Sequence, residues 1–153
     1  MKKFLSECRN KSIVTSSSEE TFIFGRHIGE SCLGGEVFLL LGDLGAGKTV
    51  FAQGLALGLG CRDKVNSPTF NILKLYNIKN KTLNKIRAFC HVDAYRLNSG
   101  KDLRAIGIEE YMGNPDTVTL IEWAEKVKSV WPDKSIKTKI IAVSESQREI
   151  TIS

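Results

Sequence analysis

At residues 42–49 the chain reads Gly42-Asp43-Leu44-Gly45-Ala46-Gly47-Lys48-Thr49. The spacing of the glycines, the lysine and the hydroxyl residue is that of a phosphate-binding loop, the Walker A motif. The glycines lack a Cβ, so the backbone can wrap with its N–H groups aimed at a polyphosphate. Lys48 adds a positive charge for the β- and γ-phosphates, and the hydroxyl of Thr49 is placed to hold Mg²⁺. The motif predicts a nucleotide-binding P-loop.

The residues on either side of the loop support this interpretation. Upstream, the apolar run 36–41 predicts a short buried parallel strand. Downstream, Phe51, Leu55 and Leu59 recur every four residues, which is typical of a helix, and Gly60 is placed to end it. A strand, a glycine-rich loop and a helix in this order put the helix dipole behind the bound phosphates.

The length predicts one domain over residues 1–153, built around the P-loop, with residues 1–11 as a polar N-terminal lead-in. Hydrophobic residues make up 42% of the chain and charged residues 25%, which is ordinary for a globular protein in water. No apolar stretch approaches the length of a membrane span, and Glu7 interrupts the apolar start that would resemble a signal peptide. We therefore expect a cytoplasmic protein with no membrane partner.

The cysteines and the net charge carry less information. Cys8, Cys32, Cys61 and Cys90 form no C-x-x-C pair, and two histidines give no zinc-site spacing, so we interpret all four as structural thiols. The net charge of +5 comes with lysines gathered between positions 74–85 and 126–139. Such a surface can attract nucleic acid or an acidic partner, but an ordinary solvated surface is the favoured interpretation.

The rest of the chain alternates between strand and helix patterns. The expected elements are a strand at 12–15, a helix from 18 to about 33, strands at 71–76 and 86–95 around a polar hairpin loop, a short helix at 100–107, a strand at 117–122, a helix at 123–130 and a terminal hairpin at 135–153. This order predicts an α/β fold. We expect a P-loop NTPase-like three-layer sandwich, with a mixed sheet that is parallel in its core and antiparallel at its edge strands.

A phosphate-binding loop needs a second component, a carboxylate at the end of a nearby strand that orients Mg²⁺ or water. Two acids qualify, because Asp93 follows the run 88–92 and Glu122 follows the run 118–121. In an open parallel sheet, ligands bind beyond the carboxyl ends of the strands, where both side chains would project. Either acid alone could be a surface residue, so the sequence leaves open which lies closer to the metal.

Three further residues each have two interpretations. Thr69 could sense the γ-phosphate as GTPase switch loops do, or belong to a rigid turn shaped by Pro68. Trp123 could pack over the nucleotide or simply cap the core. His91 is more typical of a strand histidine with satisfied hydrogen bonds than of a catalytic one.

Together these motifs closely resemble one family of small bacterial P-loop ATPases, TsaE (formerly YjeE). The matching segments are the loop at 42–49, Ser67-Pro68-Thr69-Phe70, His91-Val92-Asp93-Ala94-Tyr95-Arg96-Leu97, Gly107-Ile108-Glu109-Glu110-Tyr111 and Glu122-Trp123. They stand in the family's order and cover almost the whole chain. The loop alone would indicate only a superfamily, whereas the other segments make the resemblance specific.

The resemblance implies binding of ATP and Mg²⁺ with weak hydrolysis, in the synthesis of threonylcarbamoyladenosine next to the tRNA anticodon. It implies action on a complex of two partner proteins, TsaD and TsaB, through which the chain would reach tRNA indirectly. It assigns phosphate binding to Lys48 and the loop amides, and Mg²⁺ binding to Thr49 and Glu122. Asp93 would orient water or the metal shell, and Trp123 would lie near the nucleotide.

The resemblance also places Ser17-Ser18 near the base. The sequence departs from the family's pattern at Gln147-Arg148, where many relatives have glycine-arginine, and in the lysine-rich loop 77–85. These departures concern only base-facing or partner-facing details.

Other classes of P-loop protein fit less well. A small-molecule kinase would need a lid with arginines, and the segment 97–112 is short and holds only Arg104. A GTPase would carry Asn-Lys-x-Asp, but Asn84-Lys85-Ile86 is followed by Arg87. A nucleotide-gated binding module without significant turnover stays open, because it shares one set of motifs with a partner-stimulated ATPase.

Overall fold

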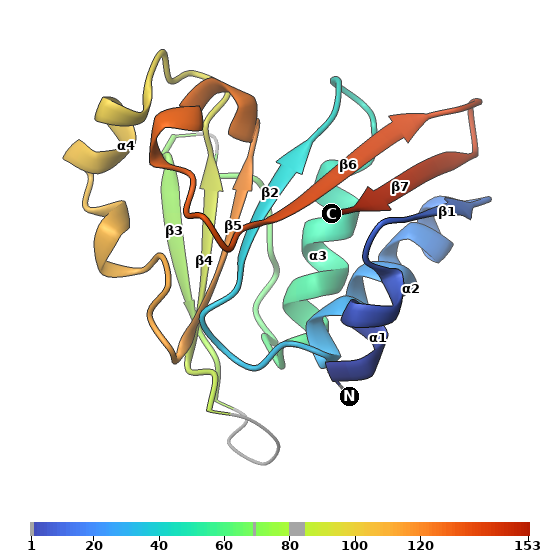
Figure 1. Cartoon of the computed structure of the whole chain (residues 1–153), viewed down its shortest axis with the longest axis horizontal. Helices are drawn as coiled ribbons and strands as arrows, with labels where there is room; N and C mark the ends of the chain where they lie inside the picture. Colours follow the sequence, from blue (N-terminus) through green and yellow to red (C-terminus); the bar gives the residue numbers. More distant parts are fainter. Residues whose placement is uncertain (1, 69, 80–84) are drawn as a thin grey trace.

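The apolar runs of the sequence assemble into one seven-stranded mixed sheet in the computed structural model, which describes residues 2–68, 70–79 and 85–153 (Figure 1). The strands lie in the order β1-β7-β6-β2-β5-β4-β3. Their bounds are β1 Lys11–Thr15, β2 Val37–Leu41, β3 Leu73–Asn77, β4 Ala88–Asp93, β5 Thr117–Glu122, β6 Ile136–Ala142 and β7 Arg148–Ile152.

The centre of the sheet is parallel and its edges are antiparallel. β2 pairs in parallel with both β5 and β6, and β5 pairs in parallel with β4. β3 on one side, and β7 and β1 on the other, are added antiparallel. This topology confirms the predicted α/β fold with a parallel core and antiparallel edge strands. It also brings the carboxyl ends of β2, β4 and β5 to one edge, where ligands of such sheets bind.

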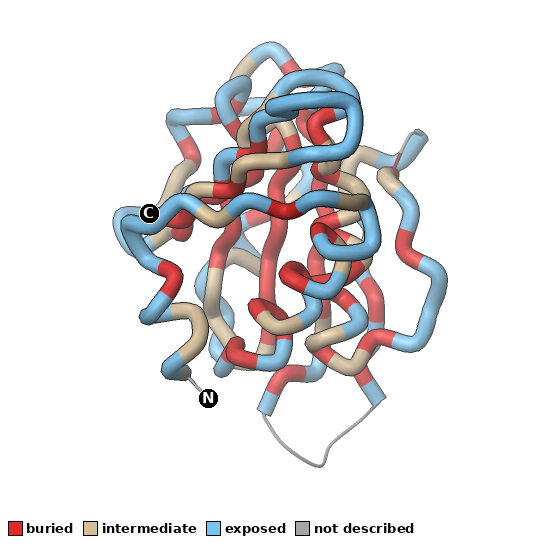
Figure 2. Tube along the Cα trace, turned by 90° about the vertical axis from the view of Figure 1, so that its right-hand side faces the viewer, coloured by how far each residue is buried: buried red, intermediate tan, exposed pale blue. Residues whose placement is uncertain are grey.

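Helices cover both faces of the sheet (Figure 1). On one face lie α1 (Lys2–Cys8), α2 (Ser18–Glu30) and α3 (Lys48–Gly58), and on the other lie α4 (Gly100–Ala105), η1 (Ile108–Glu110) and η2 (Ala124–Val130). A hydrophobic core lies on each face of the sheet, and alternate residues of β2 point into one or the other. Phe38 packs under α2 and α3, while Leu39 packs under α4 and η2. Figure 2 shows the buried strands running through the interior, with exposed segments around them. Within the described residues, no helix combines the length and apolarity that crossing a bilayer requires.

Two local expectations were wrong. The expected polar lead-in forms α1, because Phe4 packs its ring 5.9 Å from that of Phe24 and Cys8 is buried. The expected helix after β5 is a pair of 3₁₀ turns kinked at Val127. Its buried residues Ala124, Val127 and Val130 are spaced by three, the repeat of a 3₁₀-helix, so burial follows that period. The hairpin loop expected after β3 falls partly on residues 80–84, outside the described residues.

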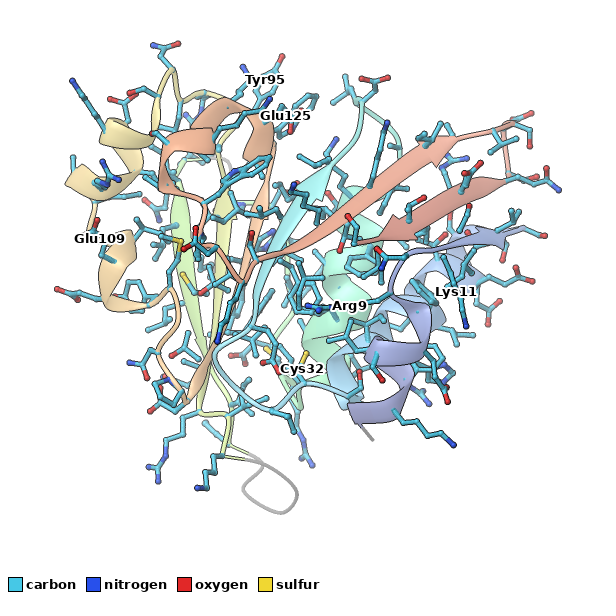
Figure 3. The ribbon with its side chains drawn as sticks, viewed as in Figure 1. Arg9, Lys11, Cys32, Tyr95, Glu109 and Glu125 are labelled. Carbon is cyan, nitrogen blue, oxygen red and sulfur yellow. The ribbon has the colours of Figure 1, made fainter. Side chains whose placement is uncertain are left out.

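The four cysteines are buried and unpaired, as the structural interpretation predicts. Cys32 lies inside the core, just past the C-terminal end of α2 (Figure 3). Burial raises the pKa of the Cys90 thiol to about 12, which keeps it protonated and unreactive at neutral pH.

The closest helix contact joins α2 to α3 through four glycines. Gly25 and Gly29 face α3, while Gly54 and Gly58 face α2. A Cβ at any of these positions would lie between 2.0 and 2.5 Å from a carbonyl oxygen of the facing helix. The two backbones therefore touch directly, and this contact fixes where the helix that begins at the P-loop lies on the sheet.

Substituting Gly54 by alanine is therefore expected to lower the free energy of unfolding by about 2–3 kcal/mol, even though alanine favours helix by about 1 kcal/mol. The added Cβ would meet the Phe22 carbonyl oxygen at 2.0 Å, so the helices must separate. Urea denaturation followed by circular dichroism measures the change. Leu57→Ala, on the exposed side of the same helix, is the control and should change stability by no more than about 0.5 kcal/mol. A Gly54→Ala protein as stable as the parent would contradict the contact.

Candidate nucleotide-binding site

The predicted phosphate-binding loop joins the carboxyl end of β2 to the first residue of α3, as its sequence context required. Gly47 caps α3 with φ 100° and ψ 17°, a left-handed conformation that favours glycine. Gly42, at φ 152°, passes so close to β6 that a Cβ would lie 2.5 Å from the Ile140 carbonyl oxygen. The loop therefore needs its glycines both for its turn and for its fit against the sheet. The free N–H groups and positive dipole of the α3 N-terminus face the hollow beside it.

Lys48 is buried in this loop, with 5% of its surface exposed. Its Nζ donates hydrogen bonds to the carbonyl oxygens of Gly42 and Asp43, the latter at 2.8 Å, and lies 3.9 Å from the centroid of the Trp123 ring. Desolvation lowers the pKa of Lys48, and the nearby carboxylates, Glu122 foremost, oppose that shift. A cation in so dry a position interacts more strongly with a phosphate than an exposed lysine would.

Trp123 is held in an unusual backbone conformation. Its φ of 57° and ψ of 39° are left-handed, which costs a residue other than glycine about 1–2 kcal/mol. The bend directs the indole ring over Lys48 and against the Tyr95 ring, whose centroid lies 5.0 Å away. Strain of this kind persists where the surroundings impose it, often at functional sites. The interpretation of Trp123 as a simple core cap does not account for its contact with the loop lysine.

A chain of polar contacts links the P-loop to the end of β5. The hydroxyl of Thr49 lies 3.0 Å from that of Ser67, which donates to the Glu122 carboxylate at 3.4 Å. His91 Nε2 lies 3.0 Å from Glu122 Oε1, and both side chains are buried. Glu122 is therefore connected to the hydroxyl predicted to hold the metal.

Asp93 lies beside Glu122, because the two residues are directly paired in the parallel register of β4 and β5. Its Oδ1 accepts a hydrogen bond of 2.9 Å from the Tyr95 backbone N–H. Burial raises the pKa of Asp93; the hydrogen bond from the Tyr95 N–H opposes this shift, and the charge of Glu122 adds to it. Of the two acids, Glu122 is the one joined to Thr49, and Asp93 is the more solvent-accessible neighbour.

These side chains surround one pocket of about 360 Å³. The pocket is lined by Ser18, Leu44, Gly45, Gly47, Lys48, Thr49, Val50, Ser67, Asp93, Glu122, Trp123 and Arg148. The loop residues Gly42, Asp43 and Ala46, also predicted to bind the nucleotide, line a neighbouring cleft instead. Thr69, considered as a γ-phosphate sensor, lies outside the described residues, and that idea stays a prediction.

Three lining residues were not predicted as site residues: Val50, directly after the loop, Ser67 and Arg148. Ser67 begins the segment Ser67-Pro68-Thr69-Phe70, and its place in that motif was the only sign in the sequence that it belongs to the site. Arg148 begins β7, yet its Nη2 donates at 3.3 Å to the carbonyl oxygen of Gly45, 103 residues earlier in the sequence. Its Nη1 donates to carbonyl oxygens of the β6–β7 turn, among them that of Ser144 at 3.0 Å. A lone arginine at a hairpin gave no sign of this contact.

The donor set fits Mg²⁺ better than a transition metal. No group of three or more histidine, cysteine or acidic side chains gathers into a metal site within the residues that the structure describes. Mg²⁺ does not require one, because it usually keeps several waters and takes one or two protein oxygens together with substrate phosphates. The hydroxyl of Thr49 and the carboxylate of Glu122, connected through Ser67, supply such oxygens.

Comparison with known proteins tests the resemblance. A family model described as "Threonylcarbamoyl adenosine biosynthesis protein TsaE" matches residues 15–150. The chain belongs to the TsaE family. The match spans the P-loop and every pocket-lining residue, from Ser18 to Arg148.

Individual relatives agree with the family assignment. The protein named "tRNA threonylcarbamoyladenosine biosynthesis protein TsaE" from Treponema pallidum is 36% identical over 91% of this chain and 97% of its own length. Its namesake from Bacillus subtilis is also 36% identical, over 90% of this chain and 81% of its own length. The crystal structure of Bacillus subtilis YdiB superimposes with a TM-score of 0.71 at 31% identity, covering 93% of this chain and 83% of that one.

Proposed function

We propose that this TsaE-family protein binds Mg-ATP in the pocket beside its P-loop and hydrolyses it weakly. We further propose that it works in the cytoplasm, on the TsaD–TsaB complex, in the threonylcarbamoyl modification of the adenosine adjacent to the tRNA anticodon. The names of its relatives support the pathway, since they are called tRNA threonylcarbamoyladenosine biosynthesis proteins.

The main support for nucleotide binding is the series of polar contacts from Thr49 through Ser67 to Glu122. A chance match to the loop pattern would not place a buried carboxylate at the end of the adjacent strand, linked to the loop hydroxyl. Nor would it bury the loop lysine beneath a strained Trp123. The arrangement is the one phosphoryl transfer uses, with fixed donors and a cation around the phosphates and an acid beside them.

Each side chain then has a role that follows from its position. The amides of the loop and Lys48 bind the phosphates, and Lys48 must turn from its carbonyl partners toward them. Thr49 and Glu122 would hold Mg²⁺, which neutralises charge on the phosphate oxygens when bound. Asp93, more exposed than Glu122, orients water through the oxygen that does not accept the Tyr95 N–H.

Arg148→Ala is expected to weaken ATP affinity about tenfold while leaving the fold unchanged. The guanidinium lines the same pocket as Lys48 and Thr49, and its hydrogen bonds go to backbone carbonyl oxygens, so its charge is available to a phosphate. Titration with a fluorescent ATP analogue measures the change. Arg62→Ala is the control, because Arg62 is exposed and does not line the pocket. Equal affinities in the Arg148 variant and the parent would remove Arg148 from the binding site.

The proposed function is tested by measuring Mg-ATP binding and turnover by the purified protein, alone and with the TsaD–TsaB pair. Slow hydrolysis alone, with clear stimulation by the pair, is the expected result. Binding without turnover in either setting would instead indicate a nucleotide-gated module. Failure to bind any nucleoside triphosphate would contradict the interpretation of the pocket, and phosphorylation of a nucleoside or small alcohol would favour the kinase alternative.

A further inference from the structure

A second hollow lies beside the P-loop. This cleft, of about 710 Å³, has the first half of the loop as one wall and η2 and β6 as the others. Lys48, Thr49, Asp93 and Glu122 do not line it. Leu44, at the tip of the loop, lines both the cleft and the nucleotide pocket.

The cleft continues onto a part of the sheet over which none of the described helices lies. Along β6, Ile136, Thr138 and Ile140 are buried toward the core beneath α2 and α3, while Lys137, Lys139 and Ile141 face outward and are exposed. On β7, Glu149 is paired opposite Ile141 and extends the same side. In Figure 1, the orange ribbon of η2 lies at the upper ends of β4 and β5, and the β6–β7 hairpin extends away from it. We call this outward side, with the cleft, the open β6 face.

The open β6 face carries lysines whose charge is not neutralised by a direct partner. Lys128, Lys137 and Lys139 line the cleft, and none has a carboxylate within 4.0 Å among the residues that the structure describes. Lys128 and Lys137 lie 6.0 and 5.6 Å from the centroid of the Trp131 ring. Among the described residues the acids that line the cleft are Asp43 and Glu125, the second of which projects at the upper edge of Figure 3.

Large apolar side chains are exposed around these lysines. Leu44 is 85% exposed at the loop tip, Ile141 44% on β6 and Val143 54% just beyond it. Single exposed apolar residues need no explanation, but a group of them around a cleft is typical of a protein-binding surface.

We propose that the open β6 face is the docking surface for an acidic, partly apolar segment of a partner protein. This inference rests on the proposed function, since the segment would belong to the TsaD–TsaB pair. Carboxylates of the segment would pair with Lys137 and Lys139, and its apolar side chains would cover Ile141 and Leu44. Because Leu44 also lines the nucleotide pocket, an occupied cleft contacts the loop that binds the phosphates. Docking and nucleotide binding are thereby coupled.

The surface favours a protein over a nucleic acid. Asp43, Glu125 and Glu149 are interspersed with the lysines and would repel a phosphate backbone. The Trp131 ring has two lysines against it and its Nε1 donates to the Ala124 carbonyl oxygen at 2.9 Å, so it does not offer a free face on which a base could stack. The exposed Leu44 gains nothing from contact with ribose and phosphate.

The test compares two double variants of the full-length protein with the same change of charge. Lys137→Glu/Lys139→Glu alters the open β6 face, and Lys64→Glu/Lys101→Glu alters exposed lysines that do not line the cleft. Biolayer interferometry measures binding to the TsaD–TsaB pair at several salt concentrations, and a fluorescent ATP analogue reports on the P-loop. We expect the first variant to bind the pair at least about tenfold more weakly, with a flatter salt dependence, and the second to change by less than about threefold. Both should bind the analogue like the parent, and Ile141→Ser should weaken only binding of the pair.

Several outcomes would overturn the proposal. Equal losses in the two double variants would show general charge attraction, and unchanged binding in both would place the partner elsewhere. Loss of tRNA binding or of self-association, with binding of the pair intact, would assign the surface to RNA or to a second copy. If the parent binds ATP but not the pair, the partner assignment of the proposed function fails. The surface is then judged by titrating a peptide of alternating glutamate and leucine and following the Trp131 indole N–H by NMR, where no shift overturns the proposal.

Discussion

Replacing Lys48 by alanine is expected to lower Mg-ATP turnover in the presence of the TsaD–TsaB pair by at least about a hundredfold, and to abolish support of tRNA threonylcarbamoylation. Lys48 lies at the N-terminus of α3, shielded from water beneath Trp123. There its charge is the one best placed to stabilise phosphate oxygens as negative charge moves during transfer. A single-turnover assay with radiolabelled ATP, alongside a complementation assay for the modified nucleoside, measures both effects.

The fold should tolerate this change. Desolvation already lowers the pKa of Lys48, so its charged form is not favoured by the folded state alone. Alanine would remove a buried cation and two hydrogen bonds to loop carbonyl oxygens, which water can replace at the pocket surface. We expect a melting temperature within a few degrees of the parent. Lys101→Ala, an exposed change on α4, is the matched control for loss of a lysine. Full turnover by the Lys48 variant would exclude the P-loop as the site of hydrolysis.

The sequence predicted best those elements whose structure depends on the residues of one short segment alone. The apolar run before the P-loop and the run ending at Glu122 became β2 and β5 close to their predicted bounds, because buried parallel strands are continuous hydrophobic stretches. The side-by-side placement of Asp93 and Glu122 followed from the geometry of parallel strands. Only the structure shows that Ser67 joins Glu122 to Thr49, since this depends on where a loop without regular periodicity folds.

Contacts between distant segments could not be derived from local patterns. Arg148 reaches Gly45 because β6 pairs with β2 and the terminal hairpin returns β7 past the P-loop, and no residue pattern encodes that strand order. The α1 helix was missed because its apolar residues span barely two turns among charged ones. The glycine contact did have a signal, as two pairs of glycines spaced by four lie on neighbouring predicted helices, Gly25 with Gly29 and Gly54 with Gly58.

Glu122→Gln is expected to separate nucleotide binding from turnover. The glutamine keeps the size of the side chain and can still accept from Ser67 and bond to His91, so the buried network survives. It loses the charge that would hold Mg²⁺ near Thr49. We therefore expect turnover to fall by about a hundredfold or more, the Mg²⁺ concentration for half-maximal turnover to rise, and nucleotide affinity without Mg²⁺ to stay close to that of the parent.

Stability distinguishes this role from a purely structural one. Glu122 is buried, and a buried charge costs free energy that its neighbours must offset, so neutral glutamine should leave the unfolding free energy unchanged or raise it. Glu122→Ala should instead destabilise the protein by about 1–3 kcal/mol, because it leaves the buried His91 Nε2 without its partner, in a ring whose Nδ1 already has none among the described residues. Asp93→Asn is the matched control for charge loss at the neighbouring strand end, and it should lower turnover without changing the Mg²⁺ dependence. If Asp93→Asn changes the Mg²⁺ dependence and Glu122→Gln does not, then Asp93 holds the metal and Glu122 does not. The link through Ser67 would then serve only to pack the loop.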